Sequence, residues 1–572
     1  MKRNYIGLSL TPHDPAIAIM NSRGEVVFAE AAERYQQNKR GWNCLPEDLI
    51  RIKSLLKNYC ESGADIVVSG SWSRIGAIEA KLYEHFFFKL FSKRSPFQGY
   101  YGMIAMAAHL KSNLDGAGLN IQWQAKHLDP KVNIIRKYYD HHYTHAAGAC
   151  YGSPYDEALC LVSDGIGNHF YPMALYHYRE GGLRRLDYYR PFNFHSLGLF
   201  YSLICNVCGF DSMKGEEWKV MGLASYGTFD ENIYKLLKKV IVVWKGRIYR
   251  PIGSAKAQLE LEAMKRKSGE PALNSANLAH TAQKYFCELL ILLLHSLHET
   301  KLSDNLILTG GSALNSSCNG IILENTDYRN LYVPSAPSDD GNAVGAAYLA
   351  FREDNPSFIP PREVLTPYLG DTFDQKALDK FIEFGPYKPT PLDGKPVHVK
   401  AAELLSGGKI VAWAQDRAEY GPRALGNRSI LADPRDEKIK DRLNATVKFR
   451  EEFRPFAPSI LHEHGPEYFE NYQESPYMER TLRFKKEVKE RVPGVVHVDG
   501  TGRLQTVKRQ WNQKYYDLIS EFKRITGIPV VLNTSFNVMG KPIVHSVEDA
   551  FTVFNASGLD ALIINDSLFE KK

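Results

Sequence analysis

Two histidines four residues apart stand in the segment YYDHHYTHAAGA, residues 138–149. The run of small residues that follows favours a helix, and this spacing would place His141 and His145 on one helical face. Two imidazoles on one face can bind the same metal ion. The alternative is a pair of partly buried histidines that hydrogen-bond to the backbone.

Carboxylates that could complete a metal site follow in two acidic motifs. VSDGIG contains Asp164, and APSDDGNAVGAA contains Asp339 and Asp340. A single Asp-Gly pair is usually only a turn, so neither motif is specific by itself. Two histidines with carboxylates suit a divalent metal, which is iron or zinc where imidazoles dominate and manganese where oxygens dominate.

A pair of glycines ends a strand-like run in LTGGSALNSS, residues 308–317. Gly310 and Gly311 could place bare backbone amides against a nucleotide phosphate or ribose. Tight packing explains a Gly-Gly turn equally well. The sequence has no GxxxxGK[ST] motif, so nucleotide chemistry of the P-loop type is not expected.

Basic residues concentrate in EYGPRALGNRSILADPR (419–435) and NATVKFREEFRPFAPSIL (444–461), where they alternate with glycine, proline and phenylalanine. They are Arg423, Arg428, Lys448, Arg450 and Arg454. A solvated basic helix would carry more acids at i+4 and fewer aromatic residues. Guanidinium groups bind phosphate and carboxylate in a bidentate manner, so several that converge suit a small, densely anionic ligand. A basic face for solvent or nucleic acid is the alternative.

Further polar residues interrupt two apolar segments near the C-terminus, TGRLQTV (501–507) and LNTSFNVMGKPI (532–543). They are Arg503, Gln505, Asn533, Ser535 and Asn537. Polar side chains that become buried on such segments need a partner. We therefore place them with the arginines as candidate ligand contacts.

Strand and helix signals alternate in the first part of the chain. YIGLSL and AIAIMNSRGEVVFAEA read as strands with NSRG as a turn, and EALCLVSDGIG with the later REGG turn repeats the pattern. A third unit of strand and glycine turn is NLILTGGSALN, residues 305–315. Such hairpins separated by helices predict an α/β domain with a mixed sheet, whose ligands bind at strand ends.

The composition changes at about residue 353, where proline and polar residues become frequent, which suits a domain junction. A second α/β unit then begins with VHVKAAELLSGGKIVAWAQ and ends with GIPVVLNTSFN and LDALIIND. The chain of 572 residues also exceeds what one hydrophobic core usually supports. We predict two domains, residues 1–355 and 356–572.

The composition is that of an ordinary soluble globular protein, with 44% hydrophobic and 24% charged residues and a mean hydropathy of −0.32. No run approaches the roughly 18 apolar residues of a membrane span, and FCELLILLLHSLH at 286–298 reads as a buried helix. The N-terminus lacks the apolar core and cleavage site of a signal peptide. We expect a cytoplasmic protein without a membrane partner.

The net charge of +6 and pI of about 8.6 suit anionic small substrates, and they equally suit a nucleic acid or another polymer. The eight cysteines include one tight pair, CNVC at 205–208, without a second pair at zinc spacing. Reduced thiols, typical of an intracellular protein, are the expectation.

Assembled, these motifs resemble one family, the ATP-dependent O-carbamoyltransferases of antibiotic and nodulation-factor biosynthesis (the tobramycin, nodulation protein U and cephalosporin carbamoyltransferase type). The matching segments run in the family's order: HDPAIAI (13–19), AERY (32–35), DHHYTHAAGA (140–149), VSDGIG (162–167), EEWKVMGLASYG (216–227), LTGGSALNSSCNG (308–320), SDDGNAVGAA (338–347), EYGPRALGNRSILADPR (419–435), KFREEFRPFAP (448–458), TGRLQTV (501–507) and LNTSFNVMGKPI (532–543). The combination is specific, although each segment alone is not.

The resemblance implies an α/β enzyme of two domains. The N-terminal one would be a duplicated α/β domain of the actin/hexokinase type, similar to metal-dependent tRNA threonylcarbamoyl transferases, and the C-terminal one a YrdC-like α/β domain. Members of the family form carbamoyl adenylate from carbamoyl phosphate and ATP, then pass the carbamoyl group to an acceptor hydroxyl and release AMP. The implied cofactors are ATP with Mg and a divalent metal, Fe(II) ahead of Mn or Zn.

The resemblance also assigns residues by motif. Lys448, Arg450, Arg503 and Ser535 would hold carbamoyl phosphate and the ATP phosphates, with Arg423, Arg428, Asn533 and Asn537 beside them. The metal would lie among His141, His145, Asp164 and Asp340, although Asp339 adjoins Asp340 and His142 adjoins His141. Gly310, Gly311 and Asn315 would lie along the adenylate, and His13 near the carbamoyl group.

These assignments imply which residues act at each step of the reaction. The arginines would neutralise the phosphates so that a carbamate oxygen can attack the α-phosphate of ATP. The metal would stabilise charge as AMP departs. A histidine, either His13 or one of the metal-site pair, would take the proton of the acceptor.

Two segments depart from the family pattern, AERYQQNKRGWN in place of a charged ERF-type segment and the Trp218 of EEWKVMGL. They lie near where an acceptor would bind, so we expect an unusual acceptor. A polymer acceptor, for example a hydroxymethylated base in DNA, is an alternative that rests on the cations and aromatic or apolar residues of FFFKLFSKRS (86–95) and LRFKKEVKERV (482–492).

Two other functions stay open. One is a non-catalytic nucleotide-binding protein of the same fold. Such a protein would not need both the residues of the metal site and the basic residues of the phosphate site. The other is a tRNA threonylcarbamoyl transferase, which the fused C-terminal domain with GPRALGNRS disfavours. The sequence does not decide the acceptor, the metal or the oligomeric state, and a homodimer stays open.

Overall fold

The computed structural model describes residues 2–73, 108–186 and 196–571, which form two compact units. The first unit comprises Met1–Gly198, Lys301–Ala313 and Tyr328–Leu365, and the second comprises Leu199–Thr300, Leu314–Asp327 and Thr366–Lys572. The chain therefore passes between the units several times. The last passage, after Leu365, falls close to the predicted junction at residue 355, and that junction stays a prediction.

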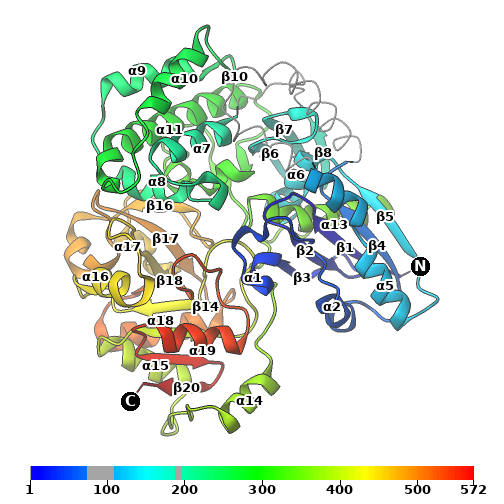
Figure 1. Cartoon of the computed structure of the whole chain (residues 1–572), viewed down its shortest axis with the longest axis vertical. Helices are drawn as coiled ribbons and strands as arrows, with labels where there is room; N and C mark the ends of the chain where they lie inside the picture. Colours follow the sequence, from blue (N-terminus) through cyan, green and yellow to red (C-terminus); the bar gives the residue numbers. More distant parts are fainter. Residues whose placement is uncertain (1, 74–107, 187–195, 572) are drawn as a thin grey trace. The chain divides into compact units, whose positions relative to one another are not determined.

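The first sheet of the first unit has five strands in the order β3-β2-β1-β4-β5 (Figure 1). They are β1 (Arg3–Ser9), β2 (Ala16–Met20), β3 (Val26–Ala31), β4 (Asp65–Gly70) and β5 (Ile134–Tyr138). β1 and β3 are both antiparallel to β2, whereas β4 is parallel to β1 and to β5. The hairpin predicted around NSRG is therefore present as β2 and β3.

The second sheet of this unit repeats the same plan. Its strands are β6 (Glu157–Ser163), β7 (Met173–Arg179), β8 (Gly182–Arg185), β11 (Asn305–Thr309) and β12 (Asn330–Tyr332). The order is β8-β7-β6-β11-β12, with β7 antiparallel to β6 and β8, and β11 parallel to β6 and β12. Strand order and direction thus match between the two sheets, which confirms the duplicated α/β domain of the actin/hexokinase type.

The helices of the first unit are α1 (Ala32–Gln36), α2 (Arg51–Tyr59), α5 (Leu119–Leu128), α6 (His141–Tyr151) and α13 (Asn342–Asp354). Helix α13 packs against α6 and β1, and its approach is close because it carries a glycine at the crossing. A Cβ atom on Gly345 would lie 1.8 Å from the carbonyl oxygen of Thr144. This contact holds the start of α6 near the start of α13.

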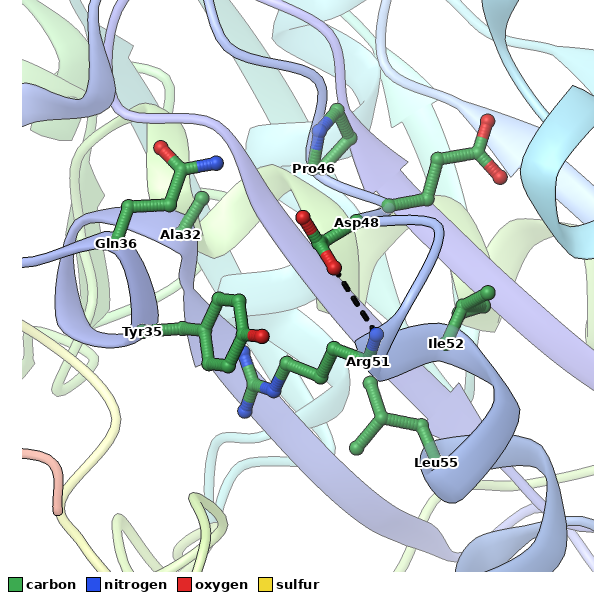
Figure 2. Close-up of a pocket in the computed structure, with 9 residues that line it drawn as sticks. Ala32, Tyr35, Gln36, Pro46, Asp48, Arg51, Ile52 and Leu55 are labelled. Carbon is green, nitrogen blue, oxygen red and sulfur yellow. Dashed lines mark hydrogen bonds between the residues drawn. The ribbon is translucent and has the colours of Figure 1, made fainter.

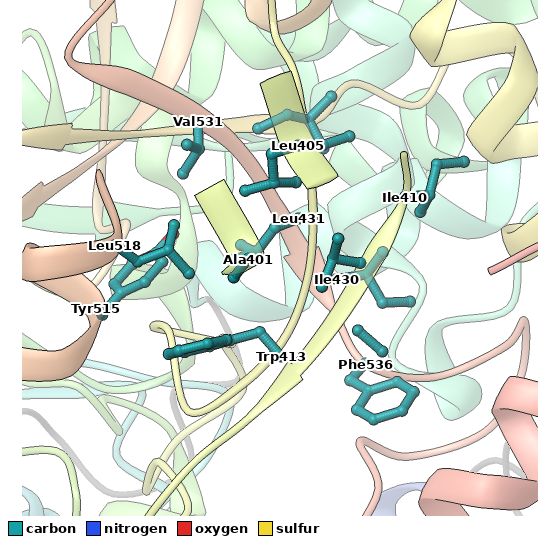
Figure 3. Packing of buried hydrophobic residues seen from close by; sticks show 14 of the residues in the cluster. Ala401, Leu405, Ile410, Trp413, Ile430, Leu431, Tyr515, Leu518, Val531 and Phe536 are labelled. Carbon is teal, nitrogen blue, oxygen red and sulfur yellow. The ribbon is translucent and has the colours of Figure 1, made fainter. Parts of the chain in front are cut away.

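The second unit contains one sheet of eight strands in the order β16-β17-β15-β18-β14-β13-β19-β20. The strands are β13 (Val411–Ala414), β14 (Arg428–Ala432), β15 (Ala457–Leu461), β16 (Arg480–Arg483), β17 (Thr501–Val507), β18 (Val530–Ser535), β19 (Ala561–Ile564) and β20 (Ser567–Glu570). Its helices include α14 (Gln375–Phe384), α15 (Val397–Ser406), α16 (Ile439–Leu443), α17 (Gly465–Tyr468), α18 (Gln513–Thr526) and α19 (Val547–Ala556). Trp413 of β13 and Tyr515 of α18 lie in its buried apolar core (Figure 3).

A helical part of the second unit precedes this sheet in the chain. It contains α7 (Leu197–Val207), α8 (Glu217–Ala224), α9 (Glu231–Val240), α10 (Ser254–Ala263), α11 (Ala276–His298), the short α12 (Ser316–Asn319) and a hairpin of β9 (Val242–Trp244) and β10 (Arg247–Tyr249). The buried helix predicted over 286–298 is confirmed as the end of α11. Within the described ranges, the structure holds no helix long and apolar enough to cross a membrane.

Candidate functional site

Four side chains of the first unit converge to form the His/Asp cluster, which we define as His141, His145, Asp164 and Asp339. Helix α6 begins at His141 because the side chain of Asp140 accepts a hydrogen bond of 2.9 Å from the backbone N–H of Tyr143 and caps the helix. The two histidines follow one turn apart, as their spacing predicts. Asp164 follows the end of β6, and Asp339 lies in a 3₁₀ turn before α13.

The distances in the His/Asp cluster suit one metal ion. Nε2 of His141 lies 3.2 Å from Oδ2 of Asp164 and 3.5 Å from Oδ1 of Asp339. Nε2 of His145 lies 3.8 Å and 3.3 Å from the same two oxygens. Donor atoms about 2.1 Å from a metal in tetrahedral geometry are separated by roughly 3.4 Å. Two imidazoles and two carboxylates in this arrangement therefore fit a divalent ion such as iron, zinc or manganese.

Asp339, and not the expected Asp340, supplies the second carboxylate of the His/Asp cluster. An oxygen of Asp340 accepts a hydrogen bond of 3.1 Å from the N–H of Gly341. Burial, and then the negative charges of Asp14, Glu33 and Asp339, raise the pKa of Asp340 to about 8. A carboxyl group with a raised pKa holds its proton against a metal ion more tightly than an ionised neighbour does.

The charges within the His/Asp cluster are strongly coupled. Burial would lower the pKa of His141, yet Asp339 and Asp164 raise it to about 10. Burial would raise the pKa of Asp339, yet the histidines hold it well below its usual range. The pKa of Asp164 is lowered in spite of burial and of Asp339, because His141 and His145 outweigh both. Ionised carboxylates are thus maintained in a buried place, which is the state that a metal ion requires.

Neighbouring side chains fix the orientation of the His/Asp cluster. The indole ring of Trp72 lies over His141, with ring centroids 4.4 Å apart. Nδ2 of Asn342 lies 3.1 Å from Nε2 of His145, the nitrogen that faces the two carboxylates, so a metal ion would take the place of this contact. The backbone N–H of Gly311 donates a hydrogen bond of 2.9 Å to Oδ1 of Asp164, opposite the oxygen that faces the histidines. Such outer contacts orient metal ligands.

The glycines predicted along the adenylate have packing reasons to be glycine. Gly310 has φ of +90°, and a Cβ atom there would lie 2.4 Å from the carbonyl oxygen of Ser163. The N–H of Gly310 donates to the carbonyl of Pro337, and the N–H of Gly311 donates to Asp164. Their placement therefore supports the His/Asp cluster, and contact with an adenylate stays a prediction.

Asn315, the third residue predicted along the adenylate, belongs to the second unit. Its side chain caps α12 by accepting from the N–H of Cys318. It also exchanges two hydrogen bonds of 3.0 and 3.1 Å with the amide of Gln283. Because protein groups occupy both ends of its amide, Asn315 has a structural role in this arrangement.

His13 adjoins the His/Asp cluster through Asp339, whose Oδ2 lies 3.6 Å from Nδ1 of His13. The same nitrogen lies 3.0 Å from Oδ2 of Asp14 and 3.0 Å from Nη2 of Arg40. Arg40 also pairs with Asp14 at 2.8 Å. Burial would raise the pKa of Asp14, but Arg40 and His13 lower it to about 2.

The segment AERYQQNKRGWN, which departs from the family pattern, borders His13. The ring of Trp42 meets the imidazole of His13 edge to face, with centroids 5.2 Å apart, and Arg40 lies over the same indole. The N–H of Asp14 donates to the carbonyl of Arg40 at 2.7 Å. These contacts bring the unusual segment to the predicted general base.

A small pocket opens over α1 and α2 (Figure 2). It is lined by Ala32, Tyr35, Gln36, Pro46, Glu47, Asp48, Arg51, Ile52 and Leu55. Arg51 pairs with Glu30, and Asp48 accepts from the N–H of Arg51 at the start of α2. Glu47 accepts from the N–H of Ile121 in α5. The charged side chains of this pocket thus contact neighbouring elements of the fold.

Four arginines of the second unit form the arginine cluster, which we define as Arg423, Arg450, Arg454 and Arg503. Burial, and then the positive charges of the other three, lower the pKa of Arg503 well below its usual value. Burial lowers the pKa of Arg423 to about 10. Within the described part of the chain, no residue forms an ion pair or hydrogen bond with the side chain of Arg423 or Arg503. This uncompensated charge favours an anionic ligand.

The other two members of the arginine cluster are held by aromatic rings. Arg450 lies over Phe456 at 4.5 Å and donates through Nε to Oδ1 of Asn444 at 2.8 Å. Arg454 lies 3.9 Å from the ring centroid of Trp218 and pairs with Glu451 at 3.3 Å. Trp218, the second departure from the family pattern, therefore supports this cluster.

Lys448 lies at the end of a π-helical turn, Asn444–Lys448, and reaches the end of β18. Its ammonium group donates to the carbonyl oxygen of Ser535 and, at 3.0 and 2.9 Å, to the carbonyl and Oδ1 of Asn537. The hydroxyl of Ser535 donates to Oδ1 of Asn537 at 2.8 Å. The structure thus brings these three predicted residues together.

Asn533 belongs to a buried polar network on neighbouring strands. Its Nδ2 donates to Ser459 at 3.1 Å and to Oε1 of Gln505 at 2.9 Å. Nε2 of Gln505 donates to the carbonyl of Leu425, so the network fixes the loop that carries Arg423. Gln505 and the amide nitrogen of Asn533 thus find their partners within the protein, whereas Oδ1 of Asn533 is buried without a hydrogen-bond partner in the described ranges.

The guanidinium of Arg428 binds backbone carbonyls, whereas the sequence predicts that it contacts phosphate. It is fully buried in β14, and its two terminal nitrogens donate to the backbone carbonyls of Gln415, Asn427, Asp371 and Asp416. Its guanidinium also lies 4.1 Å from the ring centroid of Phe373. These donors are occupied by the backbone, so Arg428 joins loops in this structure.

Comparison with known proteins finds family models and relatives that match most of this chain. Residues 4–348 match the family model of the carbamoyltransferase N-terminus, and residues 402–571 match that of the carbamoyltransferase C-terminus. Nodulation protein NolNO of Sinorhizobium fredii is 33% identical over 98% of this chain and 79% of its own length. Nodulation protein U of Rhizobium tropici is 29% identical over 99% of this chain and 96% of its own length.

Likeness to solved structures is much weaker. The activator of the 2-hydroxyisocaproyl-CoA dehydratase from Clostridium difficile aligns with 62% of this chain and 97% of its own length. The identity is 14% and the TM-score is 0.33, values too low to support an argument about fold or function.

Proposed function

Since the chain belongs to the carbamoyltransferase family, we propose that it transfers the carbamoyl group of carbamoyl phosphate to an acceptor hydroxyl and that ATP drives the reaction through carbamoyl adenylate. The observation that carries the proposal is the arginine cluster, where Arg423 and Arg503 have no counter-charge among the described residues. A cluster of this kind has a use only when a dense anion enters it.

The first half-reaction is assigned to the arginine cluster. Water cleaves the P–O bond of carbamoyl phosphate and leaves inorganic phosphate and carbamate. A carbamate oxygen then bonds to the α-phosphorus of ATP, the bond from that phosphorus to the bridging oxygen breaks, and pyrophosphate leaves. Fixed guanidinium groups offset the repulsion between carbamate and triphosphate, which otherwise blocks this attack.

Lys448, Ser535 and Asn537 are assigned to the same half-reaction. The ammonium group of Lys448 is aimed at the end of β18 by the oxygens of Ser535 and Asn537. A phosphate oxygen can replace one of these oxygens and gain a charge-assisted hydrogen bond. The buried network around Asn533 keeps the neighbouring loop in place through Nδ2, and Oδ1 of Asn533 is available to a ligand.

The second half-reaction is assigned to the His/Asp cluster and His13. The acceptor oxygen bonds to the carbamoyl carbon, the bond from that carbon to the phosphate oxygen breaks, and AMP leaves with the electron pair. A divalent metal held by His141, His145, Asp164 and Asp339 would supply Lewis-acid stabilisation of the phosphate charge. The bound metal is Fe(II) in this proposal, with Mn or Zn as alternatives that the donor set also fits.

His13 is assigned as the base that takes the acceptor's proton. Its Nδ1 is engaged by Asp14, Arg40 and Asp339, whereas Nε2 has no hydrogen-bond partner in the described ranges. Nε2 is thus the nitrogen available to an acceptor. Trp42, edge to face with His13, offers an apolar surface beside it.

The test is a reaction without acceptor. Purified protein is mixed with ATP, carbamoyl phosphate and Fe(II) or Mn(II), and pyrophosphate and carbamoyl adenylate are measured, the latter by mass spectrometry. We expect one pyrophosphate and one inorganic phosphate per adenylate, and loss of all three in Arg503→Ala. Arg442→Ala is the matched control, because Arg442 pairs with Asp560 at 2.7 Å away from the cluster. Binding of ATP without adenylate under any of these metals would overturn the proposal.

A further inference from the structure

The positive charge of the chain is concentrated in one short segment. Residues 231–267 contain ten lysines and arginines and three glutamates, which gives a net charge of +7, whereas the whole chain carries +6. This segment comprises α9, the β9–β10 hairpin and α10 in the helical part of the second unit (Figure 1). The remainder of the chain is therefore close to neutral.

The hairpin presents aromatic rings on its outer face. In its antiparallel register Trp244 pairs with Arg247, and Val242 pairs with Tyr249, so these four side chains share one face. Trp244 is 60% exposed and Tyr249 is 38% exposed, with ring centroids 6.0 Å apart. On the other face, Ile248 is buried. The rings are thus held outward by a hairpin whose inner face is anchored.

Cations alternate with these rings. Lys245 at the turn lies over the indole of Trp244 at 4.7 Å, and Arg247 lies beside it in the register. Within the described part of the chain, Lys245 and Arg247 form no ion pair, and Arg250 hydrogen-bonds to the uncharged Gln258. The charges of Lys245 and Arg247 are therefore available to a partner, and both rings are exposed to solvent.

Of the two segments that suggested a polymer partner from the sequence, the structure describes one. FFFKLFSKRS (86–95) lies outside the described residues. In LRFKKEVKERV (482–492), Leu482, Phe484 and Val488 are all buried, so the segment exposes charged side chains of both signs without aromatic rings. The β9–β10 hairpin has both features on one exposed face.

We infer that this face, formed by Trp244, Lys245, Arg247 and Tyr249 with the exposed Arg250 following in the chain, binds single-stranded nucleic acid, an interaction that goes beyond the proposed carbamoyl transfer. Phosphates would meet the three cations, and unpaired bases would stack on the two rings. A second copy of this chain is disfavoured as occupant, because it would bring two segments of charge +7 together. An acidic peptide would meet the cations but would leave the rings unused.

The test measures the fluorescence anisotropy of a labelled (dT)20 oligonucleotide titrated with the full-length protein. For three phosphate contacts, Kd is expected to rise about 20-fold between 50 and 200 mM NaCl. Trp244→Ala should weaken binding about fivefold or more, since one stacked base is lost. An abasic oligonucleotide of equal length keeps the phosphates, so wild type should bind it at least about fivefold more weakly than (dT)20.

Matched variants distinguish binding at this hairpin face from binding through the overall positive charge of the protein. Lys245→Glu with Arg247→Glu should weaken (dT)20 binding at least tenfold, whereas Lys376→Glu with Lys380→Glu on α14 makes the same charge change and should not. Trp123→Ala, which removes an indole 68% exposed on α5, controls for Trp244→Ala. The inference is overturned if wild type does not bind (dT)20 at 50 mM NaCl, if both charge reversals weaken it equally, or if the abasic strand binds as tightly. Displacement of (dT)20 by polyglutamate of equal charge would also overturn it and would favour an acidic protein partner.

Discussion

The two oxygens of Asp339 face different partners: Oδ2 lies 3.6 Å from Nδ1 of His13, and Oδ1 lies 3.3 Å from Nε2 of His145. One carboxylate therefore connects the predicted general base with the His/Asp cluster. Because Asp339 is buried and ionised, it orients His13 electrostatically and remains available to a metal. Any change at Asp339 should affect metal binding and proton transfer together.

Asp339→Asn and Asp340→Asn form a matched pair that tests this assignment. Replacement of Asp339 removes a charged donor from the His/Asp cluster, so we expect metal affinity to fall at least about 100-fold. Replacement of Asp340, whose pKa is about 8 and whose oxygen accepts from Gly341, should change metal affinity by less than about tenfold. Isothermal titration with Mn(II) and metal analysis after dialysis measure both. The reverse order would assign the ligand to Asp340.

Arg503→Met should lose activity and gain stability. The guanidinium of Arg503 is repelled by the rest of the arginine cluster, so its removal should raise the free energy of unfolding of the ligand-free protein by about 1 kcal/mol. Pyrophosphate release should fall at least about 100-fold, because a fixed positive charge is lost at the phosphates. Thermal unfolding with and without inorganic pyrophosphate checks both effects. Wild type should be stabilised by pyrophosphate more than the variant, and equal stabilisation would argue against a ligand at this cluster.

Arg428→Met should have the opposite effect on stability. Four backbone carbonyls would lose their donors on its removal, and we expect a cost of about 3 kcal/mol or more. Thermal unfolding of Arg428→Met and Arg503→Met under the same conditions measures the contrast. If Arg428→Met unfolds like wild type but does not release pyrophosphate, the predicted phosphate contact is right and the structural role is wrong.

Local signals in the sequence were sufficient for much of the fold. The β2–β3 hairpin, the helix that begins beside Asp140 and the end of α11 all have short-range causes, namely a turn, a cap and an apolar period. The repeated strand and turn pattern hinted at two similar halves, and the duplicated fold itself was expected through the family resemblance. It is visible in the matched strand orders of the two sheets, which depend on pairing between segments far apart in the chain.

Local sequence signals did not distinguish the roles of adjacent residues or of residues of the same type. Asp339 and Asp340 differ only in the direction that a 3₁₀ turn gives to each side chain. The backbone carbonyls that bind Arg428 come from two separate loops, and one of them contains Asp371, 57 residues away. Spacing along the chain contains no information about such contacts. A basic segment therefore indicates positive charge, but it does not show which of its arginines lacks an ion-pair or hydrogen-bond partner in the fold.

His497 provides a prediction on pH. Burial, aided by the positive charges of Arg503 and Lys440, lowers its pKa to about 4 from an ordinary 6.5, and its Nε2 is buried without a hydrogen-bond partner in the described ranges. Between these two pH values the unfolded chain binds a proton that the folded chain does not, so this residue's contribution to stability is present above pH 6.5 and is lost as the pH falls towards 4. We expect a loss of about 2 to 3 kcal/mol at pH 4.5 that His497→Gln does not share. Urea unfolding midpoints at pH 7.5 and 4.5 measure it, with His127→Gln on the exposed face of α5 as control. If acid lowers the urea midpoint as much in His497→Gln as in wild type, groups other than His497 cause the pH dependence.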